Sequence, residues 1–351
     1  MNWIRWVRPN IIKLTPYSSA RSEFKGQASI FLDANENPYP LPYARYPDPL
    51  QKELKSRISN WRNIKESQIF LGNGSDEIID LLIRIFCIPG VDTIYTFTPG
   101  FGMYKVAADI NDVKVITYPL SQSFSLDIDR FIEKKPESCK IIFLCTPNNP
   151  TGSSLSHDQI RAICKKSQTM VLVDEAYIDF SEIGTSLPLL ATEKNLVILQ
   201  TFSKALGAAG LRLGMGFAQK ELVDILNKIK MPYNISKVNQ EEAIRVMERV
   251  PYYTPFINEI KRERALLVEK LTEFSFVKKV YPSDGNFLLI KVDDANDLYH
   301  ALKNKGIIVR NRTSLPGCDN CLRITIGVPE ENECLLNAMQ AYTNTNDQRD
   351  G

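Results

Sequence analysis

The segment from Thr201 to Gly214, TFSKALGAAGLRLG, decides how this chain folds and where its site lies. It follows an apolar run at residues 195–200, NLVILQ, which is long enough for one buried strand. Lys204 comes soon after that strand, and Arg212 follows eight residues later, beyond a run of small residues. Because a lysine is rarely buried without a partner, Lys204 either turns back to solvent or supplies an amine to a partly dry pocket.

The composition is that of an ordinary globular protein. The chain has 351 residues, of which 44% are apolar and 24% charged, and this length predicts two domains or one large domain with an appendage. A formal net charge of +2 gives no basis for binding nucleic acid or an anionic membrane. No apolar run approaches the ~20 residues needed to cross a bilayer. Residues 1–17 lack the apolar centre of a signal peptide, so we expect a cytoplasmic protein.

Cysteine and histidine usage narrows the chemistry. The seven cysteines are too sparse for a disulfide framework, although Cys318 and Cys321 form one C-x-x-C pair. A zinc site would need two more ligands, and His157 and His300, the two histidines, lie far away in sequence. We therefore expect an ordinary loop with two thiols and no metal. The scarcity of histidine also argues against a Ser-His-Asp or Cys-His mechanism.

Short β-rich runs alternate with helical patterns between residues 68 and 218. The predicted strands are 68–72, 92–97, 113–120, 140–145, 169–174, 195–200 and 213–218. Several are almost continuously apolar, which is typical of a sheet covered on both faces. The alternation predicts an open, mostly parallel α/β sheet of seven strands, in which ligands bind beyond the carboxyl ends of the strands.

The pattern changes after the sheet. A helical stretch at 236–274 is expected to break or kink near Pro251 and Pro255. Strands at 286–292, 306–312 and 321–327, with helices at 296–306 and 330–343, then predict a smaller α+β domain. The expected division is 1–45 (an arm and part of the small domain), 46–235 (large domain), 236–275 (connecting helices), 276–345 (small domain) and 346–351 (frayed tail).

Polar residues gather at the ends of the predicted strands. Asp174 ends one strand, and the proline-rich turn TPNNPTG at 146–152, which holds Asn149, follows another. A helix begins at GNGSD, where Gly74, Ser75 and Asp76 offer free N–H groups and the positive end of the helix dipole to an anion. Ser203, Lys204 and Arg212 complete the set. An amine, a buried carboxylate, an anion-binding helix end and a second cation are what pyridoxal phosphate (PLP) requires.

The motifs PNNPTG, VDEAY and SKALGAAGLRLG, in this order, resemble those of fold-type I PLP-dependent aminotransferases. The resemblance implies that Lys204 forms the Schiff base and moves the catalytic proton, and that Asp174 pairs with the ring nitrogen. It implies that Tyr177 and Asn149 bind the 3′-oxygen of the ring and that Tyr104 stacks on its face. The phosphate would be held by Gly74, Ser75, Asp76, Ser203 and Arg212. Taken singly, each feature has a plainer explanation. Lys204 could point to solvent, Ser75 could cap its helix, and Tyr104 could pack in the core.

The chain further resembles the histidinol-phosphate aminotransferases, from about residue 9 to 342. The motifs are KLTPYSSAR (13–21), LDANENPYP (32–40), ARYPDP (44–49), RNR (310–312) and CLRITIG (321–327). Two guanidinium groups on separate strands suit a phosphate dianion better than one, unless Arg310 is simply paired at the surface. The resemblance implies that Arg310, Arg323 and Tyr17 bind the substrate phosphate and that Asn35 and Glu36 line the substrate side. It also implies that Tyr46 reaches the cofactor phosphate of the other subunit in a homodimer with shared sites.

Three alternatives stay open at this point. An aromatic-amino-acid aminotransferase and a threonine-phosphate decarboxylase use the same scaffold, and the decarboxylase also binds a phosphate. The arm motifs favour the histidinol-phosphate reaction over both. A non-catalytic regulator on this fold would carry a DNA-binding domain ahead of it, and only about 30 residues precede LDANENP.

Overall fold

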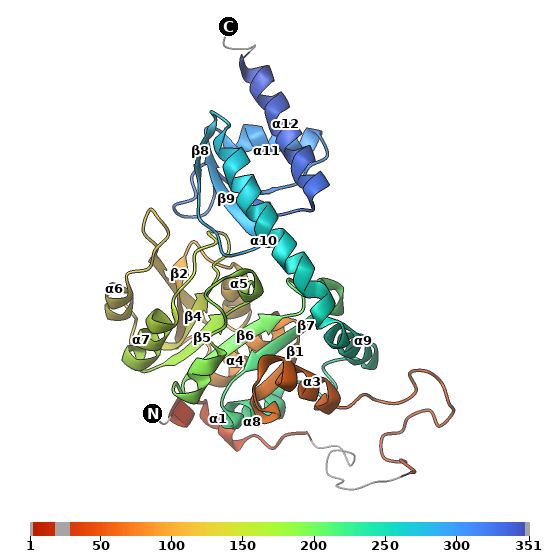
Figure 1. Ribbon diagram of the computed structural model, residues 1–351. Helices are drawn as coiled ribbons and strands as arrows, with labels where there is room; N and C mark the ends of the chain where they lie inside the picture. Colours follow the sequence, from red (N-terminus) through yellow and green to blue (C-terminus); the bar gives the residue numbers. More distant parts are fainter. Residues whose placement is uncertain (1–2, 18–28, 348–351) are drawn as a thin grey trace.

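The large domain is built around a seven-stranded sheet (Figure 1). The computed structural model describes residues 3–17 and 29–347. The strands are β1 (Ile69–Asn73), β2 (Thr93–Thr98), β3 (Lys114–Pro119), β4 (Cys139–Cys145), β5 (Met170–Asp174), β6 (Leu196–Thr201) and β7 (Leu213–Phe217). Each coincides with a predicted strand, and the α/β fold class is confirmed. Their order is β1-β7-β6-β5-β4-β2-β3, and β7 runs antiparallel to both of its neighbours while the other pairs are parallel.

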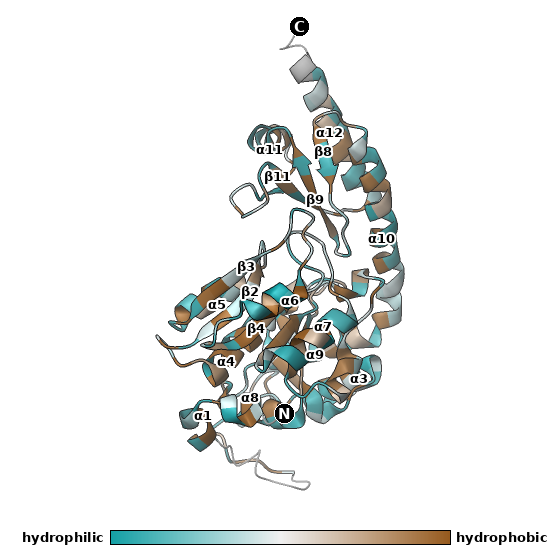
Figure 2. Cartoon of the chain, turned by 90° about the vertical axis from the view of Figure 1, so that its left-hand side faces the viewer, coloured by the Kyte–Doolittle hydropathy of each residue, from teal (hydrophilic) through white to brown (hydrophobic). Residues whose placement is uncertain are grey.

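Helices cover both faces of this sheet, which is why its strands read as continuous apolar runs. One face packs against α4 (Ser75–Phe86), α5 (Met103–Ile110) and α8 (Lys220–Ile229). The other packs against α3 (Lys52–Arg62), α6 (Ile128–Glu133), α7 (His157–Ser167) and α9 (Lys237–Glu248). Figure 2 shows the hydrophobic colour on the strands and inner helix faces and the hydrophilic colour on outer faces such as that of α7.

Short helices occupy several of the connections. These 3-10 helices are η1 (Trp3–Trp6), η2 (Glu66–Gln68), η3 (Ile178–Phe180), η4 (Leu187–Ala191) and η5 (Ala209–Leu211). Together with α1 (Pro9–Lys13), η1 lies on the large domain, where Trp3 and Val7 join the core beside Phe86. The first residues therefore belong to the large domain, and the expectation that residues 1–45 contribute to the small domain is wrong for this segment. The reason is burial: Trp3 and Val7 find their apolar partners on α4 and α8.

The long helix α10 (Val250–Thr272) connects the two domains (Figure 1). The predicted break at Pro251 is confirmed, because α9 ends at Glu248 and Pro251 stands in the first turn of α10. At Pro255 the helix continues, contrary to expectation. Pro255 lies near the start of the helix, so its missing N–H removes only one hydrogen bond close to a turn that lacks acceptors anyway.

The small domain is a four-stranded antiparallel sheet in the order β10-β11-β9-β8, backed by helices. Its elements are β8 (Val277–Val280), β9 (Phe287–Val292), β10 (Arg310–Asn311), β11 (Cys321–Thr325), α11 (Ala295–Asn304) and α12 (Pro329–Asp347). The sequence missed β8, whose lysines break the apolar pattern, and it predicted β10 as far longer. The helix α12 runs to Asp347, beyond the expected start of the frayed tail, and residues 348–351 lie outside the described part.

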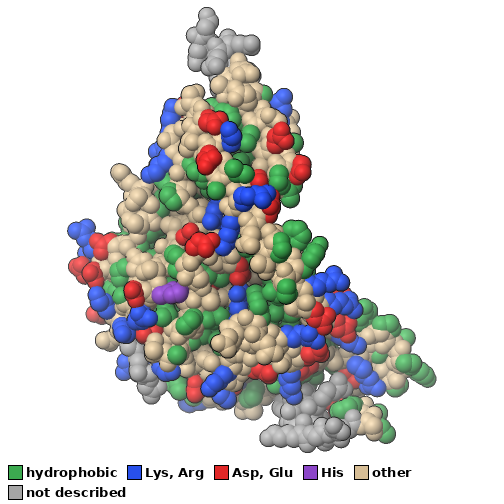
Figure 3. Space-filling view, viewed as in Figure 1, with side chains coloured by type: hydrophobic (Ala, Val, Ile, Leu, Met, Phe, Trp, Pro, Cys, Tyr) green, Lys and Arg blue, Asp and Glu red, His purple; other side chains and the backbone are tan. Residues whose placement is uncertain are grey.

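The surface carries no region of a single charge sign in the view of Figure 3, where acidic and basic side chains are interspersed. Among residues 3–17 and 29–347, no helix is long and apolar enough to span a membrane.

Gly214 fixes how closely β7 approaches the start of α4. A Cβ atom at this position would overlap the backbone of Gly74 and Ser75. We expect Gly214→Ala to lower the free energy of unfolding by about 1–3 kcal/mol, because the backbone of one element must move. Urea denaturation followed by circular dichroism measures this loss. The matched control is Gly210→Ala, where the added methyl group meets no atom within 4 Å. Equal stability of both variants would contradict the assigned role of Gly214.

Candidate active site

A cavity of about 110 Å³ lies at the carboxyl ends of β4, β5 and β6, beside the N-terminus of α4. This is where an open α/β sheet is expected to bind its ligand. Its lining residues are Ser75, Asp76, Phe101, Cys145, Asp174, Ala176, Tyr177, Thr201, Ser203, Lys204 and Arg212. Seven predicted site residues therefore meet in one cavity, although they come from four separate segments of the chain.

Asp174 is the buried carboxylate of this cavity, with only 3% of its surface exposed. Its oxygens accept hydrogen bonds from the Tyr104 hydroxyl (2.9 Å) and the Ala176 N–H (3.1 Å). Neither donor is a cation, and burial raises the pKa of Asp174 to about 6. The carboxylate therefore sits in the cavity wall in an environment that favours a positively charged partner.

The neighbouring Glu175 is also buried but is fully engaged elsewhere. It accepts from the Thr185 hydroxyl, the Ser186 N–H and the Gln200 amide at 2.6–2.8 Å. Because successive strand residues point to opposite faces, only Asp174 reaches the cavity. This assigns different tasks to the two acids of VDEAY: Glu175 fixes the loop at 185–186, and Asp174 faces the ligand.

Tyr104 does not lie where the sequence placed it. It is 2% exposed, donates to Asp174 and packs 4.9 Å from the ring of Phe143, so it supports Asp174 from behind. Burial, followed by the charge of Asp174, raises its pKa. Phe101 lines the cavity instead, with its ring 5.4 Å from that of Tyr104. The stacking assignment for Tyr104 is wrong. Tyr104 is the second residue of α5, which begins at Met103, and its side chain is buried in the core, whereas Phe101, two residues before the helix, faces the cavity.

Lys204 sits in a tight turn directly after β6. The Thr201 hydroxyl accepts from the Ser203 N–H (3.1 Å), and the Lys204 carbonyl accepts from the Gly207 N–H (3.0 Å). These bonds project the lysine into the cavity mouth, where Nζ lies 5.6 Å from the centre of the Tyr177 ring. Residue 204 as a whole is exposed, but its amine is partly removed from solvent. This partial burial, followed by the charge of Arg323, lowers the pKa of Lys204. A larger fraction of neutral, nucleophilic amine follows.

The start of α4 and Arg212 form the other end of the cavity. Gly74 is the N-cap residue, with φ of 76°, and its N–H donates to the Arg212 carbonyl at 2.7 Å. No side chain caps α4, so the alternative that Ser75 serves only as a helix cap is wrong. A Cβ atom on Gly74 would lie 2.8 Å from Arg212 Nη2, which itself lies 3.4 Å from Asp76 Oδ2. First-turn N–H groups, a hydroxyl and a guanidinium thus converge, as an anion site requires.

A chain of hydrogen bonds leads from the cavity to the small domain. The Asn149 amide donates to the Tyr177 hydroxyl at 3.1 Å, and Asn149 Oδ1 accepts from Arg323 Nη1 at 2.5 Å. Burial raises the pKa of Tyr177 to about 12, so its hydroxyl keeps its proton at neutral pH. Arg323 lies on β11 and Asn149 in the loop after β4, so this chain joins the two domains at the cavity.

The two predicted small-domain arginines are brought together. Arg310 on β10 lies directly opposite Arg323 on β11 in the antiparallel register, so both side chains share one face of the sheet. No described carboxylate forms an ion pair with Arg310, which does not support the alternative of a paired surface arginine. The sequence assigned no role to Arg312, although its motif RNR was noted.

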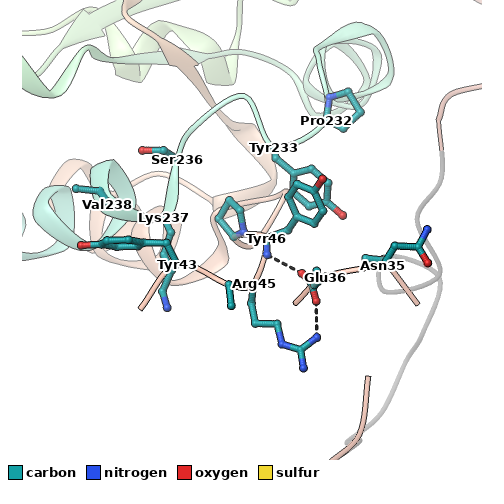
Figure 4. Close-up of a pocket in the computed structure, with 13 residues that line it drawn as sticks. Asn35, Glu36, Tyr43, Arg45, Tyr46, Pro232, Tyr233, Ser236, Lys237 and Val238 are labelled. Atoms are coloured by element: carbon teal, nitrogen blue, oxygen red, sulfur yellow. Dashed lines mark hydrogen bonds and ion pairs between the residues drawn. The ribbon is translucent and has the colours of Figure 1, made fainter. Parts of the chain in front are cut away.

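The arm residues lie apart from this cavity. Asn35, Glu36 and Tyr46 line a second hollow of about 550 Å³ that shares no residue with the first (Figure 4). There Glu36 accepts from the Tyr46 N–H (2.6 Å) and pairs with Arg45 (2.8 Å), while Tyr46 stacks on Tyr233 with ring centres 4.5 Å apart.

Tyr17, also on the arm, is 73% exposed and does not line the Lys204 cavity. Residues 18–21 of its motif KLTPYSSAR lie outside the described part of the chain.

The C-x-x-C pair is part of the small-domain turn. Cys318 and Cys321 are fully buried, and the Cys321 N–H donates to the Cys318 carbonyl at 3.0 Å. Within residues 3–17 and 29–347, no group of three His, Cys, Asp or Glu side chains is placed to hold a metal ion.

Comparison with known proteins identifies the family. The family of class I and II aminotransferases matches residues 40–339. The chain belongs to this family. The resemblance to PLP-dependent aminotransferases that the sequence motifs predicted is therefore confirmed. A histidinol-phosphate aminotransferase from Parabacteroides distasonis is 52% identical over 334 residues, which cover 95% of this chain and 97% of that protein. One from Christiangramia forsetii is 46% identical over 340 residues, with 96% and 97% covered.

Solved structures of the family share the fold. The histidinol-phosphate aminotransferase from Clostridium acetobutylicum superposes with a TM-score of 0.79 at 25% identity, covering 86% of this chain and 91% of that one. The L-threonine-O-3-phosphate decarboxylase from Porphyromonas gingivalis reaches 0.75 at 23% identity, with 86% and 91% covered. That second likeness concerns the fold alone.

The environment of Asp174 predicts a pH dependence of stability. Its pKa rises from 3.8 to about 6 on folding, so the folded state holds this proton longer than the unfolded state does. Without cofactor, the wild type should therefore lose about 2–3 kcal/mol of stability relative to Asp174→Asn as the pH rises from 4 to 7. Urea denaturation of both proteins across this range measures the difference.

The control for this experiment is Asp158→Asn, which removes a carboxylate that is 89% exposed. The stability of Asp158→Asn should change with pH in the same way as that of the wild type. A constant difference between Asp174→Asn and the wild type at all pH values would contradict the burial of a charged Asp174.

Proposed function

We propose that this chain is a PLP-dependent aminotransferase that acts on L-histidinol phosphate. It transfers the amino group to 2-oxoglutarate, giving imidazole-acetol phosphate and L-glutamate, a step of histidine biosynthesis. The observation that carries the proposal is the identity of 46–52% over nearly the whole chain with proteins of that name. The two arginines that share one face of the small sheet support a phosphorylated substrate.

The cavity fits PLP by the chemistry of its groups. A buried carboxylate without a cationic partner, Asp174, suits a protonated ring nitrogen. The end formed by Ser75, Ser203 and Arg212, with first-turn N–H groups of α4, suits a phosphate. Phe101 offers an aromatic face, and Asn149 and Tyr177 offer polar groups for the 3′-oxygen of the ring. When bound, PLP supplies an aldehyde that links to an amine and a ring that withdraws electrons.

The side chains of the cavity divide the remaining work. Lys204 would supply the amine that holds the cofactor, and its Nζ would take the proton from the substrate Cα. Its lowered pKa favours the neutral form that this proton transfer requires. Asp174 keeps the ring nitrogen protonated, and Tyr104 fixes the orientation of Asp174 through its hydrogen bond. Arg323, whose guanidinium donates to Asn149, would bind the carboxylate of glutamate in the second half-reaction.

A substrate panel tests the proposal against its alternatives. The purified holoenzyme is assayed with 2-oxoglutarate and L-histidinol phosphate, with L-phenylalanine, and with phosphothreonine. We expect kcat/KM to be highest for histidinol phosphate. Preference for phenylalanine would indicate an aromatic aminotransferase, and carbon dioxide released from phosphothreonine would indicate a decarboxylase. No turnover of any substrate by PLP-loaded protein would indicate a non-catalytic regulator.

Lys204→Ala tests the assignment of the amine. We expect turnover to fall by at least about 10³-fold, because the covalent attachment and the base are lost together. Borohydride reduction of the wild-type holoenzyme followed by peptide mapping should place the cofactor mass on Lys204 itself. Lys220→Ala, which removes an exposed lysine paired with Asp224, is the control and should keep full activity. A label on any other lysine would end the assignment.

We further propose that the chain acts as a homodimer in which the arm completes the site of the second copy. Asn35, Glu36 and Tyr46 lie in a hollow separate from their own Lys204 cavity. The arm also exposes large apolar side chains, such as Leu32 at 88% and Tyr39 at 71%. Such exposure is typical of a surface that a partner covers. The cytoplasmic location expected from the sequence stays a prediction.

Subunit mixing tests the shared site. If each site combines Lys204 of one subunit with Tyr46 of the other, a hybrid of Tyr46→Ala and Lys204→Ala subunits contains one site with both residues intact and one site with neither. After equal amounts are unfolded and refolded together, we expect the mixture to recover about a quarter of wild-type activity. This exceeds the average of the two separate variants. Activity that stays at that average would contradict sharing, because each arm would then serve its own chain.

A further inference from the structure

Arg312 stands beside the two arginines already assigned. Its N–H donates to the Cys321 carbonyl at 2.9 Å, which continues the β10–β11 ladder by one residue. In this register Arg310 opposes Arg323, and residues two apart on a strand point to the same face. Arg310, Arg312 and Arg323 are therefore directed from the same face of the small sheet.

None of these three guanidinium groups forms an ion pair with a carboxylate in the described part of the chain. By contrast, Arg62 pairs with Asp179 at 2.9 Å. In the described part of the chain, Arg310 and Arg312 form no side-chain hydrogen bond or ion pair. Arg323 donates a hydrogen bond to the neutral Asn149 and lies over the Phe287 ring, but it pairs with no carboxylate. The Nε atom of Arg312 is buried without an acceptor. A buried guanidinium nitrogen without an acceptor is costly unless a ligand provides one.

The electrostatics agree with this geometry. Burial, and then the charges of Arg323 and Arg310, lower the pKa of Arg312 to about 10, and no carboxylate contributes. Burial and the charge of Arg310 likewise lower the pKa of Arg323. Tyr177, which lines the Lys204 cavity, is close enough to Arg312 and Arg323 to influence the pKa of both, so the cluster lies next to the proposed site. Three mutually repelling cations beside a cavity favour a multiply charged anion.

We infer that Arg312 is a third phosphate-binding residue, which selects phosphorylated amines over their unphosphorylated counterparts. The inference rests on the proposed function and deepens it. Two guanidinium forks provide the charge for a dianion, and Arg312 adds donors to an oxygen that Arg310 and Arg323 leave free. Arg312 binds the non-reacting end of the substrate, so its contribution appears mainly in substrate affinity.

The experiment compares L-histidinol phosphate with L-histidinol in the holoenzyme. We expect Arg312→Gln to lower kcat/KM for histidinol phosphate about 10- to 100-fold, mostly through KM, and to change it for histidinol less than about 3-fold. Arg312→Lys should recover part of the loss, since the charge remains and the fork is gone. Inorganic phosphate, used as a competitive inhibitor, should bind more weakly to Arg312→Gln by a similar factor.

Arg262→Gln is the matched control, because Arg262 is 65% exposed and pairs with Glu259 on α10; it should leave all constants unchanged. Equal losses for histidinol phosphate and histidinol, or no loss for either, would overturn the role of Arg312 while leaving the proposed function intact. If the wild type itself fails to prefer histidinol phosphate over histidinol, the proposed function fails instead. Thermal unfolding of each variant separates a folding defect from a binding defect.

Discussion

A buried carboxylate whose hydrogen-bond donors are both neutral is the constraint on which the site depends. Asp174 ends β5 at the centre of the sheet, and its two donors, Tyr104 and Ala176, are both neutral. An isolated charge at such a depth destabilises the fold unless something positive binds there. The surrounding groups follow from this requirement: Glu175 is held away from the cavity, Tyr104 fixes the acid from behind, and Lys204 stands at the mouth.

The sequence predicted the sheet well because several of its strands are almost continuous apolar runs, such as β4, β5 and β6. The polar residues that follow those runs meet because the carboxyl ends of parallel strands lie at one edge of the sheet. Lys204, Asp174, Ser75 and Arg212 could thus be found without coordinates. Residues whose orientation depends on where a helix begins could not be assigned from the sequence. Phe101 and Tyr104 are three residues apart, and only the start of α5 at Met103 decides which one faces the cavity.

The small domain was harder to predict, for a different reason. Two of its strands, β8 and the two-residue β10, are short and partly exposed, so they leave little hydrophobic pattern to detect. The importance of Arg312 depends on the pairing register between β10 and β11 and on the absence of carboxylates nearby in space. Neither property can be obtained from spacing along the chain. The place of the N-terminal residues on the large domain also depends on tertiary burial, through Trp3 and Val7.

The hydrogen bond between Arg323 and Asn149 has a consequence for motion. It ties the small sheet to the loop whose Asn149 also donates to the Tyr177 hydroxyl. A swing of the small domain must disturb this hydrogen bond together with the contact between the rings of Phe287 and Tyr177, whose centres lie 5.0 Å apart. The position of the small domain is therefore coupled to Asn149 and Tyr177, two polar side chains beside the cavity.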